Sequence, residues 1–159
     1  VCRGIGTSFG YNEAEDDSSY ASPTELIHML VNIVADGGNL LLNVGPMATG
    51  EIPWAQQERL LAIGQWLSVN GDAIYSSSTH SQSSLVTSEG LPVRLTAGID
   101  GGTYAIVMGR PSGKIVHITG LPQGETTLLG YDGLLQRIGD DVILPFRPDN
   151  TPAFTLRVI

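Results

Sequence analysis

Two different hydrophobic periodicities divide the chain. In the first half, apolar residues recur at helical spacing in two segments, and each segment follows a short apolar run. After Gly71 no helical pattern returns, and apolar and polar residues alternate in short stretches that are typical of strands. The pattern predicts an α/β part followed by an all-β part, which we place at residues 1–78 and 79–159.

The first helical segment has clear start and stop signals. Ser22-Pro23-Thr24-Glu25 can form a capping box with proline at the first helical position. Asp36-Gly37-Gly38 allows the left-handed residue that ends a helix. The apolar face between them consists of Leu26, Ile27, Leu30, Val31 and Val34. We expect His28 to lie on the helix surface or to be partly packed.

The second helical segment opens at Gly50-Glu51-Ile52-Pro53 and ends at Asn70-Gly71. Gln56 to Arg59 are polar, and we expect them to face water. The apolar stripe is formed by Leu60, Ile63, Gly64 and Leu67, and is widened by Leu61 and Trp66.

Two short apolar runs are candidates for parallel strands, at Val1 to Ile5 and at Leu40 to Val44. The second run is apolar throughout, which predicts a strand buried on both faces of a parallel sheet. In such sheets chemistry gathers at the carboxyl end of the strand, here Asn43 to Met47. A buried strand with a tight exit turn and no function explains the same pattern. Two strand–helix units cannot cover a sheet, so further strands are expected from elsewhere.

The second half reads as an antiparallel β-sandwich packed on the α/β part. The polar stretch Ser76 to Ser84 is interpreted as a linker or surface loop. Turn signals occur at residues 100–102, 111–113 and 131–133. The predicted strands are 93–99, 103–108, 114–118, 126–129, 134–138, 142–144 and 154–159.

The composition restricts the classes of molecule that we expect the protein to bind. Sixteen acidic and eight basic residues give a net charge of −8, which argues against a nucleic acid or an anionic membrane surface. A neutral ligand such as a sugar is compatible. Cys2 is the single cysteine, so no internal disulfide is expected. We find no apolar run long enough to cross a bilayer and no targeting segment, so the compartment stays open.

An acidic loop at Glu13, Glu15, Asp16 and Asp17 is a candidate for acid/base chemistry or for binding a hard cation. A solvated loop is the simpler account.

Several motifs resemble, in their order, the C-terminal part of α-L-fucosidases of glycoside hydrolase family 29. The resemblance covers residues 1 to about 78 closely, and the β-rich remainder only in position and strand character. The motifs are Ser8-Phe9-Gly10-Tyr11-Asn12, Glu25-Leu26-Ile27, the run from Gly37 to Pro46, Gln57 to Leu61, and the run from Trp66 to Tyr75.

The resemblance implies the C-terminal strand–helix units of a (β/α) TIM-like barrel followed by an antiparallel β-sandwich. Residues 1–78 are then the last part of a barrel catalytic domain, with strands at 1–6 and 40–44, and the chain is a fragment. The family's fold and activity further imply hydrolysis of α-linked L-fucose with retention, through two carboxyl groups about 5 Å apart. The family's aspartate nucleophile and glutamate acid/base precede the Phe-Gly-Tyr-Asn motif. Neither has a matching position here, so we assign no catalytic residue and expect the isolated fragment to be inactive.

Phe9 is the one substrate-binding residue that the resemblance implies, because its position lines the pocket around the fucose ring and its methyl group. An apolar aromatic face suits a 6-deoxy sugar. A barrel-end core residue is the alternative interpretation of Phe9. Asn43 and Gly45 are expected to shape the pocket, and Tyr11 and Asn12 to hold the loop. The family requires no metal or organic cofactor.

The implied partners are a fucosylated glycan and the missing N-terminal barrel segment, and a homo-oligomer is left open. A noncatalytic carbohydrate-binding or interaction module is the alternative function, with Phe9, Tyr11, Trp54 and Trp66 as stacking platforms. Core packing explains Trp66 better, whereas Trp54 opens a helix and is free to be exposed. A third alternative is pairing with a separately encoded or nicked N-terminal part, since a half-barrel leaves an unpaired strand edge and an exposed apolar face.

Overall fold

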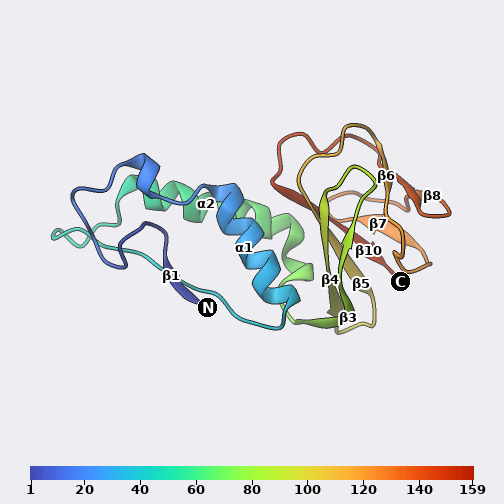
Figure 1. The fold of residues 1–159 in the computed structure, drawn as a ribbon, viewed down its shortest axis with the longest axis horizontal. Helices are drawn as coiled ribbons and strands as arrows, with labels where there is room; N and C mark the ends of the chain where they lie inside the picture. The colour runs from blue at the N-terminus through green and yellow to red at the C-terminus, as the bar shows by residue number, and fades with distance from the viewer.

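A layer of two helices covers one face of a five-stranded sheet, and a three-stranded sheet covers the other face (Figure 1). The computed structural model describes residues 1–159. A separate pair of short strands lies beside the helices, away from the two sheets. The arrangement of one α/β part and one all-β part is the one that the periodicities predict.

Helix α1 spans Pro23–Ala35 and begins with the predicted capping box. The Ser22 hydroxyl accepts from the backbone N–H of Glu25 at 3.2 Å, and the Glu25 carboxylate accepts from the backbone N–H of Ser22 at 2.7 Å. The helix ends where Gly37 takes a φ of +79°, in the left-handed region that favours glycine. The predicted start and stop of this helix are therefore confirmed.

Helix α2 spans Trp54–Asn70 and continues into a 3₁₀ turn, η2, at Gly71–Ala73. Its boundaries match the prediction, but its buried face does not. Gln56 and Arg59 were expected to face water, and they are only 3 % and 8 % exposed. Their polar groups bind backbone atoms of neighbouring loops, so these side chains are buried because they are hydrogen-bonded.

Strands β1 (Cys2–Gly4) and β2 (Leu41–Asn43) form a two-stranded parallel sheet, in the register Cys2 to Leu41 and Gly4 to Asn43. The parallel direction agrees with the prediction. The expected burial is wrong for this chain, because Leu41 is 59 % exposed. With only two strands in the sheet, nothing covers that side chain.

The remaining strands are all antiparallel and enclose a core in the manner of a β-sandwich. One sheet has the order β3-β4-β5-β10-β7 and the other the order β6-β9-β8. Their bounds are β3 Ser77–Val86, β4 Pro92–Gly98, β5 Thr103–Met108, β6 Ile115–His117, β7 Thr126–Leu128, β8 Gln136–Ile138, β9 Asp141–Ile143 and β10 Ala153–Val158.

The interpretation of residues 76–84 as a linker or surface loop is wrong, because β3 is the longest strand of the sheet and begins at Ser77. Its polar residues are mostly exposed, since β3 is an edge strand. Backbone pairing with β4 holds it, and the register shifts between Thr79 and Ser84. Neither face of this strand is fully buried, so it lacks the alternation that would reveal a strand in the sequence.

The helix layer is tied to the five-stranded sheet by packing and by specific polar contacts. Ile27 and Val31 of α1 and Trp66 of α2 pack with Tyr104, Ile106 and Met108 of β5. His28 Nε2 lies 2.8 Å from the carbonyl oxygen of Pro152, which agrees with its predicted partly packed position. Arg94 of β4 forms an ion pair with Asp36 at the end of α1. No helix has the length and apolar character needed to cross a membrane.

Candidate functional site

The candidate site lies at the carboxyl edge of the two parallel strands. Because Gly4 pairs with Asn43, the segments that follow β1 and β2 leave the sheet at the same edge. One of these segments carries Phe9 to Asn12, and the other carries Asn43 to Met47. The topology therefore brings the two motifs together.

Phe9 sits on an exposed loop that neighbouring backbone and side chains hold. Its ring is on the surface, with 58 % of the residue exposed, so it is not buried as a core residue within this chain. The side-chain amide of Asn43 donates to the carbonyl oxygen of Phe9 at 2.5 Å. Asn12 donates to the Ser8 hydroxyl at 3.0 Å and accepts from the backbone N–H of Ala14, as expected for a residue that holds the loop.

The Glu15 and Asp16 carboxylates of the acidic loop accept hydrogen bonds from residues of the loop and of the segment before it. Glu15 accepts from the Thr7 hydroxyl at 2.6 Å and from the backbone N–H of Ser8 at 2.5 Å, and these bonds lower the pKa of its carboxyl group. Asp16 caps the 3₁₀ turn η1 (Asp17–Ser19), and hydrogen bonds from Ser18 lower its pKa. No group of three or more histidine, cysteine or acidic side chains is arranged to hold a metal ion. The contacts favour a loop-ordering role for these residues.

Gly45 brings the two loops into direct backbone contact. A Cβ atom at this position would lie 2.5 Å from the Tyr11 nitrogen and 2.7 Å from the Gly10 carbonyl carbon, so only glycine permits this approach. The backbone N–H of Gly45 donates to Gln56 Oε1 at 2.9 Å. The sequence does not reveal the role of Gln56, because no pattern distinguishes a buried glutamine in the first turn of a helix from a solvated one.

The sequence pattern also did not reveal that Arg59 is a buried residue with specific partners. Its guanidinium lies 2.8 Å from the Asp17 carboxylate, donates to the Ala55 carbonyl at 3.1 Å, and lies 5.7 Å from the centroid of the Tyr20 ring. These contacts fasten the end of the acidic loop to α2. The acidic cluster at residues 13–17 ends five positions before Ser22, and no sequence pattern links it to an arginine of the second helix.

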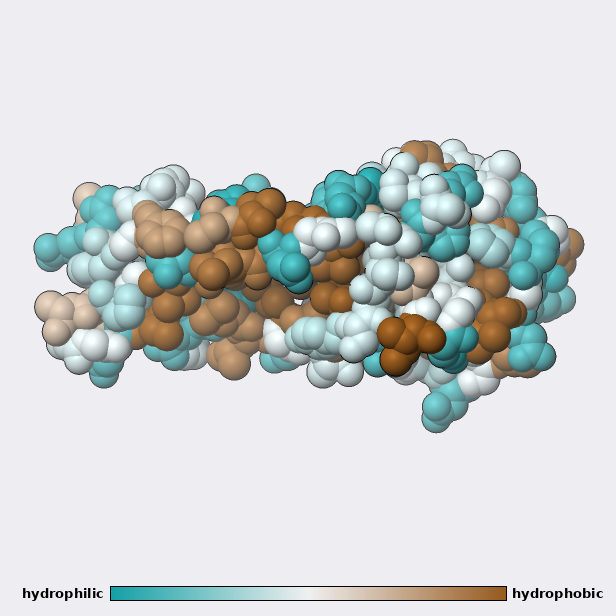
Figure 2. Space-filling model, turned by 90° about the horizontal axis from the view of Figure 1, so that it is seen from below, coloured by the Kyte–Doolittle hydropathy of each residue, from teal (hydrophilic) through white to brown (hydrophobic).

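Apolar side chains gather on one face of the part that holds the helices and the parallel strands (Figure 2). Exposed large apolar residues of residues 1–75 are Val1, Phe9, Tyr11, Leu41, Trp54, Leu61, Val69 and Tyr75. Contiguous apolar patches on a protein surface are typical of sites where another chain segment or a partner packs.

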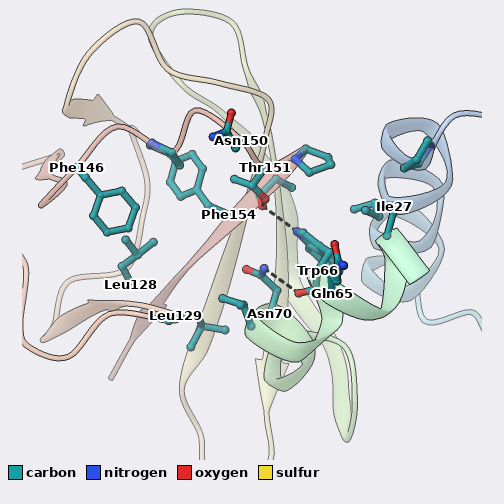
Figure 3. Close-up of a pocket in the computed structure, with 17 residues that line it drawn as sticks. Ile27, Gln65, Trp66, Asn70, Leu128, Leu129, Phe146, Asn150, Thr151 and Phe154 are labelled. Atoms are coloured by element: carbon teal, nitrogen blue, oxygen red, sulfur yellow. Dashed lines mark hydrogen bonds between the residues drawn. The ribbon is translucent and has the colours of Figure 1, made fainter. Parts of the chain in front are cut away.

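A cavity of about 540 Å³ opens between α2 and the β-sandwich, and Phe9 does not line it (Figure 3). No charged side chain lines it either. Trp66 lies on its wall, 5 % exposed, and its indole N–H donates to the carbonyl oxygen of Ala153 at 2.8 Å. Trp66 is therefore a core residue, as expected, and not a free stacking platform. Trp54 is exposed.

Comparison with known proteins finds that the chain is similar to α-L-fucosidases. The family model described as Alpha-L-fucosidase matches residues 1–72, which include both loops of the site. An alpha-L-fucosidase of Dictyostelium discoideum is 39 % identical over 160 residues, covering 99 % of this chain and 33 % of the relative. A tissue alpha-L-fucosidase of Mus musculus is 50 % identical over 70 residues, or 44 % of this chain and 16 % of the relative.

Solved structures extend the similarity to the β-rich half. The Thermotoga maritima alpha-fucosidase in complex with fucose is 34 % identical with a TM-score of 0.90, over 99 % of this chain and 39 % of that one. Alpha-L-fucosidase isoenzyme 1 from Paenibacillus thiaminolyticus is 26 % identical with a TM-score of 0.80, and the match covers 99 % of this chain and 38 % of that one. The chain thus spans about a third of the length of the first relative. It belongs to the α-L-fucosidase family, glycoside hydrolase family 29, of which it represents the C-terminal part.

Proposed function

We propose that the complete protein is a retaining glycosidase that releases terminal α-L-fucose from glycans. Residues 1–78 supply the C-terminal strand–helix units of its TIM-like barrel, and residues 79–159 its C-terminal β-sandwich domain. The two catalytic carboxylates lie on barrel segments outside this chain. The observation that carries the proposal is the exposed Phe9 ring at the carboxyl edge of the parallel strands.

Phe9 is the substrate-binding residue of this segment. A flat apolar ring at the mouth of a barrel can pack against the methyl group and the C–H surface of a 6-deoxy sugar. Its backbone is held by Asn43, so the ring is presented from a fixed loop. A site for this hydrolysis needs only carboxyl groups and an oriented sugar, and so calls for no metal or organic cofactor.

The missing barrel segment is the main partner of this chain. Leu41 exposes its side chain on a two-stranded parallel sheet, which cannot form a barrel by itself. The apolar face of Figure 2 provides a surface on which neighbouring barrel elements can pack. The segment that covers this surface also supplies the two catalytic carboxylates, which this chain does not contain.

Hydrolysis of 4-nitrophenyl α-L-fucopyranoside by the complete protein tests the function. We expect Phe9→Ala to raise KM because the sugar loses an apolar contact. Phe146→Ala is the matched control, since Phe146 is a half-exposed phenylalanine of the β-sandwich that packs edge-on against Tyr131 at 6.3 Å between ring centroids. We expect its KM to equal that of the wild type.

Residues 1–159 alone are expected to release no fucose. Fucose release by this piece would overturn the placement of the carboxylates. Loss of glycan binding in Phe146→Ala but not in Phe9→Ala would instead favour a carbohydrate-binding module in the β-rich half.

A further inference from the structure

We propose that Gln56 is a positioning residue that sets the place of the Phe9 ring through the backbone of Gly45. The inference rests on the proposed role of Phe9 in binding the sugar. It assigns a function to a side chain that makes no hydrogen bond to Phe9 and whose burial the helical pattern does not explain.

The first step is the contact between Gln56 and Gly45. Gln56 lies in the first turn of α2 with 3 % of its surface exposed. Its Oε1 accepts the backbone N–H of Gly45 at 2.9 Å, and no other acceptor of that N–H is present. Because a buried N–H without a partner is costly, this bond fixes the turn after β2 against the helix.

The second step is the contact between that turn and the loop of Phe9. The Gly45 backbone lies so close to Gly10 and Tyr11 that a Cβ would come within 2.5 Å of the Tyr11 nitrogen. Two residues earlier, Asn43 donates to the Phe9 carbonyl oxygen at 2.5 Å. The turn therefore holds the peptide that follows Phe9 both by contact and by a hydrogen bond.

The residue before Phe9 is held from a different side. Glu15 accepts the N–H of Ser8 and the hydroxyl of Thr7 from within the loop itself. Glu15 can order the loop but does not connect it to a helix. Gln56 connects the Gly45 turn to the first turn of α2, whereas Arg59 fastens the far end of the acidic loop to the same helix at Asp17. Gln56 therefore acts on the position of Phe9 through the turn after β2.

We expect a displaced Phe9 ring to impair the substrate that carries the C6 methyl group more than one that lacks it. A ring that moves by a fraction of an ångström loses contact with the C6 methyl of fucose, while the carboxylates on other segments keep their place. One methyl group in an apolar pocket is worth about 10- to 200-fold in kcat/KM. A loss of positioning therefore appears as weaker discrimination for the methyl group.

The test measures the ratio of kcat/KM for two substrates of the complete protein. These are 4-nitrophenyl α-L-fucopyranoside and 4-nitrophenyl β-D-arabinopyranoside, which has the same ring configuration without the methyl group. We expect Gln56→Met, which keeps the shape but loses the acceptor, to lower this ratio about fivefold or more. Gln56→Glu keeps an oxygen for the Gly45 N–H in either protonation state, and we expect it to restore most of the ratio.

Gln57→Met is the matched control. Gln57 is the next residue of the same helix, and its amide donates to the Ile52 carbonyl at 2.7 Å and not to the turn. We expect it to leave the ratio unchanged. If Gln56→Met does not fold, Gln56→Asn takes its place, because the shorter side chain keeps the amide but cannot reach Gly45.

A double variant separates positioning from general damage. In the Phe9→Ala background, adding Gln56→Met should change the ratio no further. An equal loss for both substrates in Gln56→Met, with the ratio preserved, would overturn the positioning role while the fucosidase function stands. A wild-type protein that hydrolyses neither substrate would overturn both, and the fault would then lie in the proposed function.

Discussion

The indole N–H of Trp66 donates to the backbone carbonyl of Ala153 at 2.8 Å and joins α2 to β10. Ala153 is fully buried, and its carbonyl also accepts from the Thr151 hydroxyl at 2.6 Å. The hydrogen bond between Trp66 and Ala153 crosses the boundary between the helix layer and the five-stranded sheet. The helices are thus fastened to the β-sandwich by a directional contact as well as by apolar packing.

We expect Trp66→Ala to lower the free energy of unfolding by about 3–5 kcal/mol, because a large buried side chain leaves a cavity. Trp66→Phe should cost only about 1 kcal/mol, because Thr151 still satisfies the Ala153 carbonyl. Urea denaturation provides the measurement. Trp54→Ala is the control, since Trp54 is 65 % exposed, and its change should stay within about 0.5 kcal/mol. Equal costs for the two alanine variants would contradict the core assignment of Trp66.

Gly45→Ala should destabilise the protein by about 1–3 kcal/mol, because its methyl group would press on the Tyr11 and Gly10 backbone. Gly64→Ala offers a contrast within α2, where no atom outside the helix backbone lies within 4 Å of the added Cβ. We expect that change to stabilise the helix by about 0.5–1 kcal/mol. Thermal or urea unfolding of both variants gives the comparison, and a neutral Gly45→Ala would show that the two loops are not in contact.

Arg59→Lys should lower the free energy of unfolding by about 1–2 kcal/mol, although it keeps the charge. A lysine ammonium cannot reach the Ala55 carbonyl and the Asp17 carboxylate while also lying over Tyr20. Hydrogen exchange of residues 17–21 should speed up in the variant. Arg110→Lys, at an exposed position, is expected to have no effect on either quantity. Unchanged exchange in Arg59→Lys would rule out the fastening role.

The Glu15 carboxylate makes the order of the Phe9 loop dependent on pH. Hydrogen bonds from Thr7 and Ser8 lower its pKa in the folded state. Its contribution is therefore complete well above the ordinary glutamate pKa of about 4.3 and is lost as the pH falls through the lowered folded value. The ¹⁵N–¹H signal of Ser8 should shift over this acidic range in the wild type. Glu15→Gln should abolish that shift, and its persistence would assign it to another group.

Local signals in the sequence were enough to place most elements. The capping box at Ser22 and Glu25 and the left-handed Gly37 mark the ends of α1, because these signals act within one helical turn. The turn at Gly101, with a φ of +82°, separates β4 from β5 as predicted. The order of the fucosidase motifs indicated the family, and the edge at which Phe9 and Asn43 meet followed from the parallel direction of the two strands.

Which polar residues are buried and which apolar residues are exposed depends on contacts between segments that are distant in the sequence. Gln56 and Arg59 are buried because loops distant in sequence bring them hydrogen-bond partners, and periodicity cannot reveal such partners. Leu41 is exposed because burial of a strand depends on neighbouring strands that two strand–helix units do not supply. The polar segment from Ser77 became a strand because β4 offers its backbone an edge for pairing. Local signals therefore define the helices, the turns and the family, whereas contacts between distant segments define which side chains are buried and which residues hold the loop of Phe9.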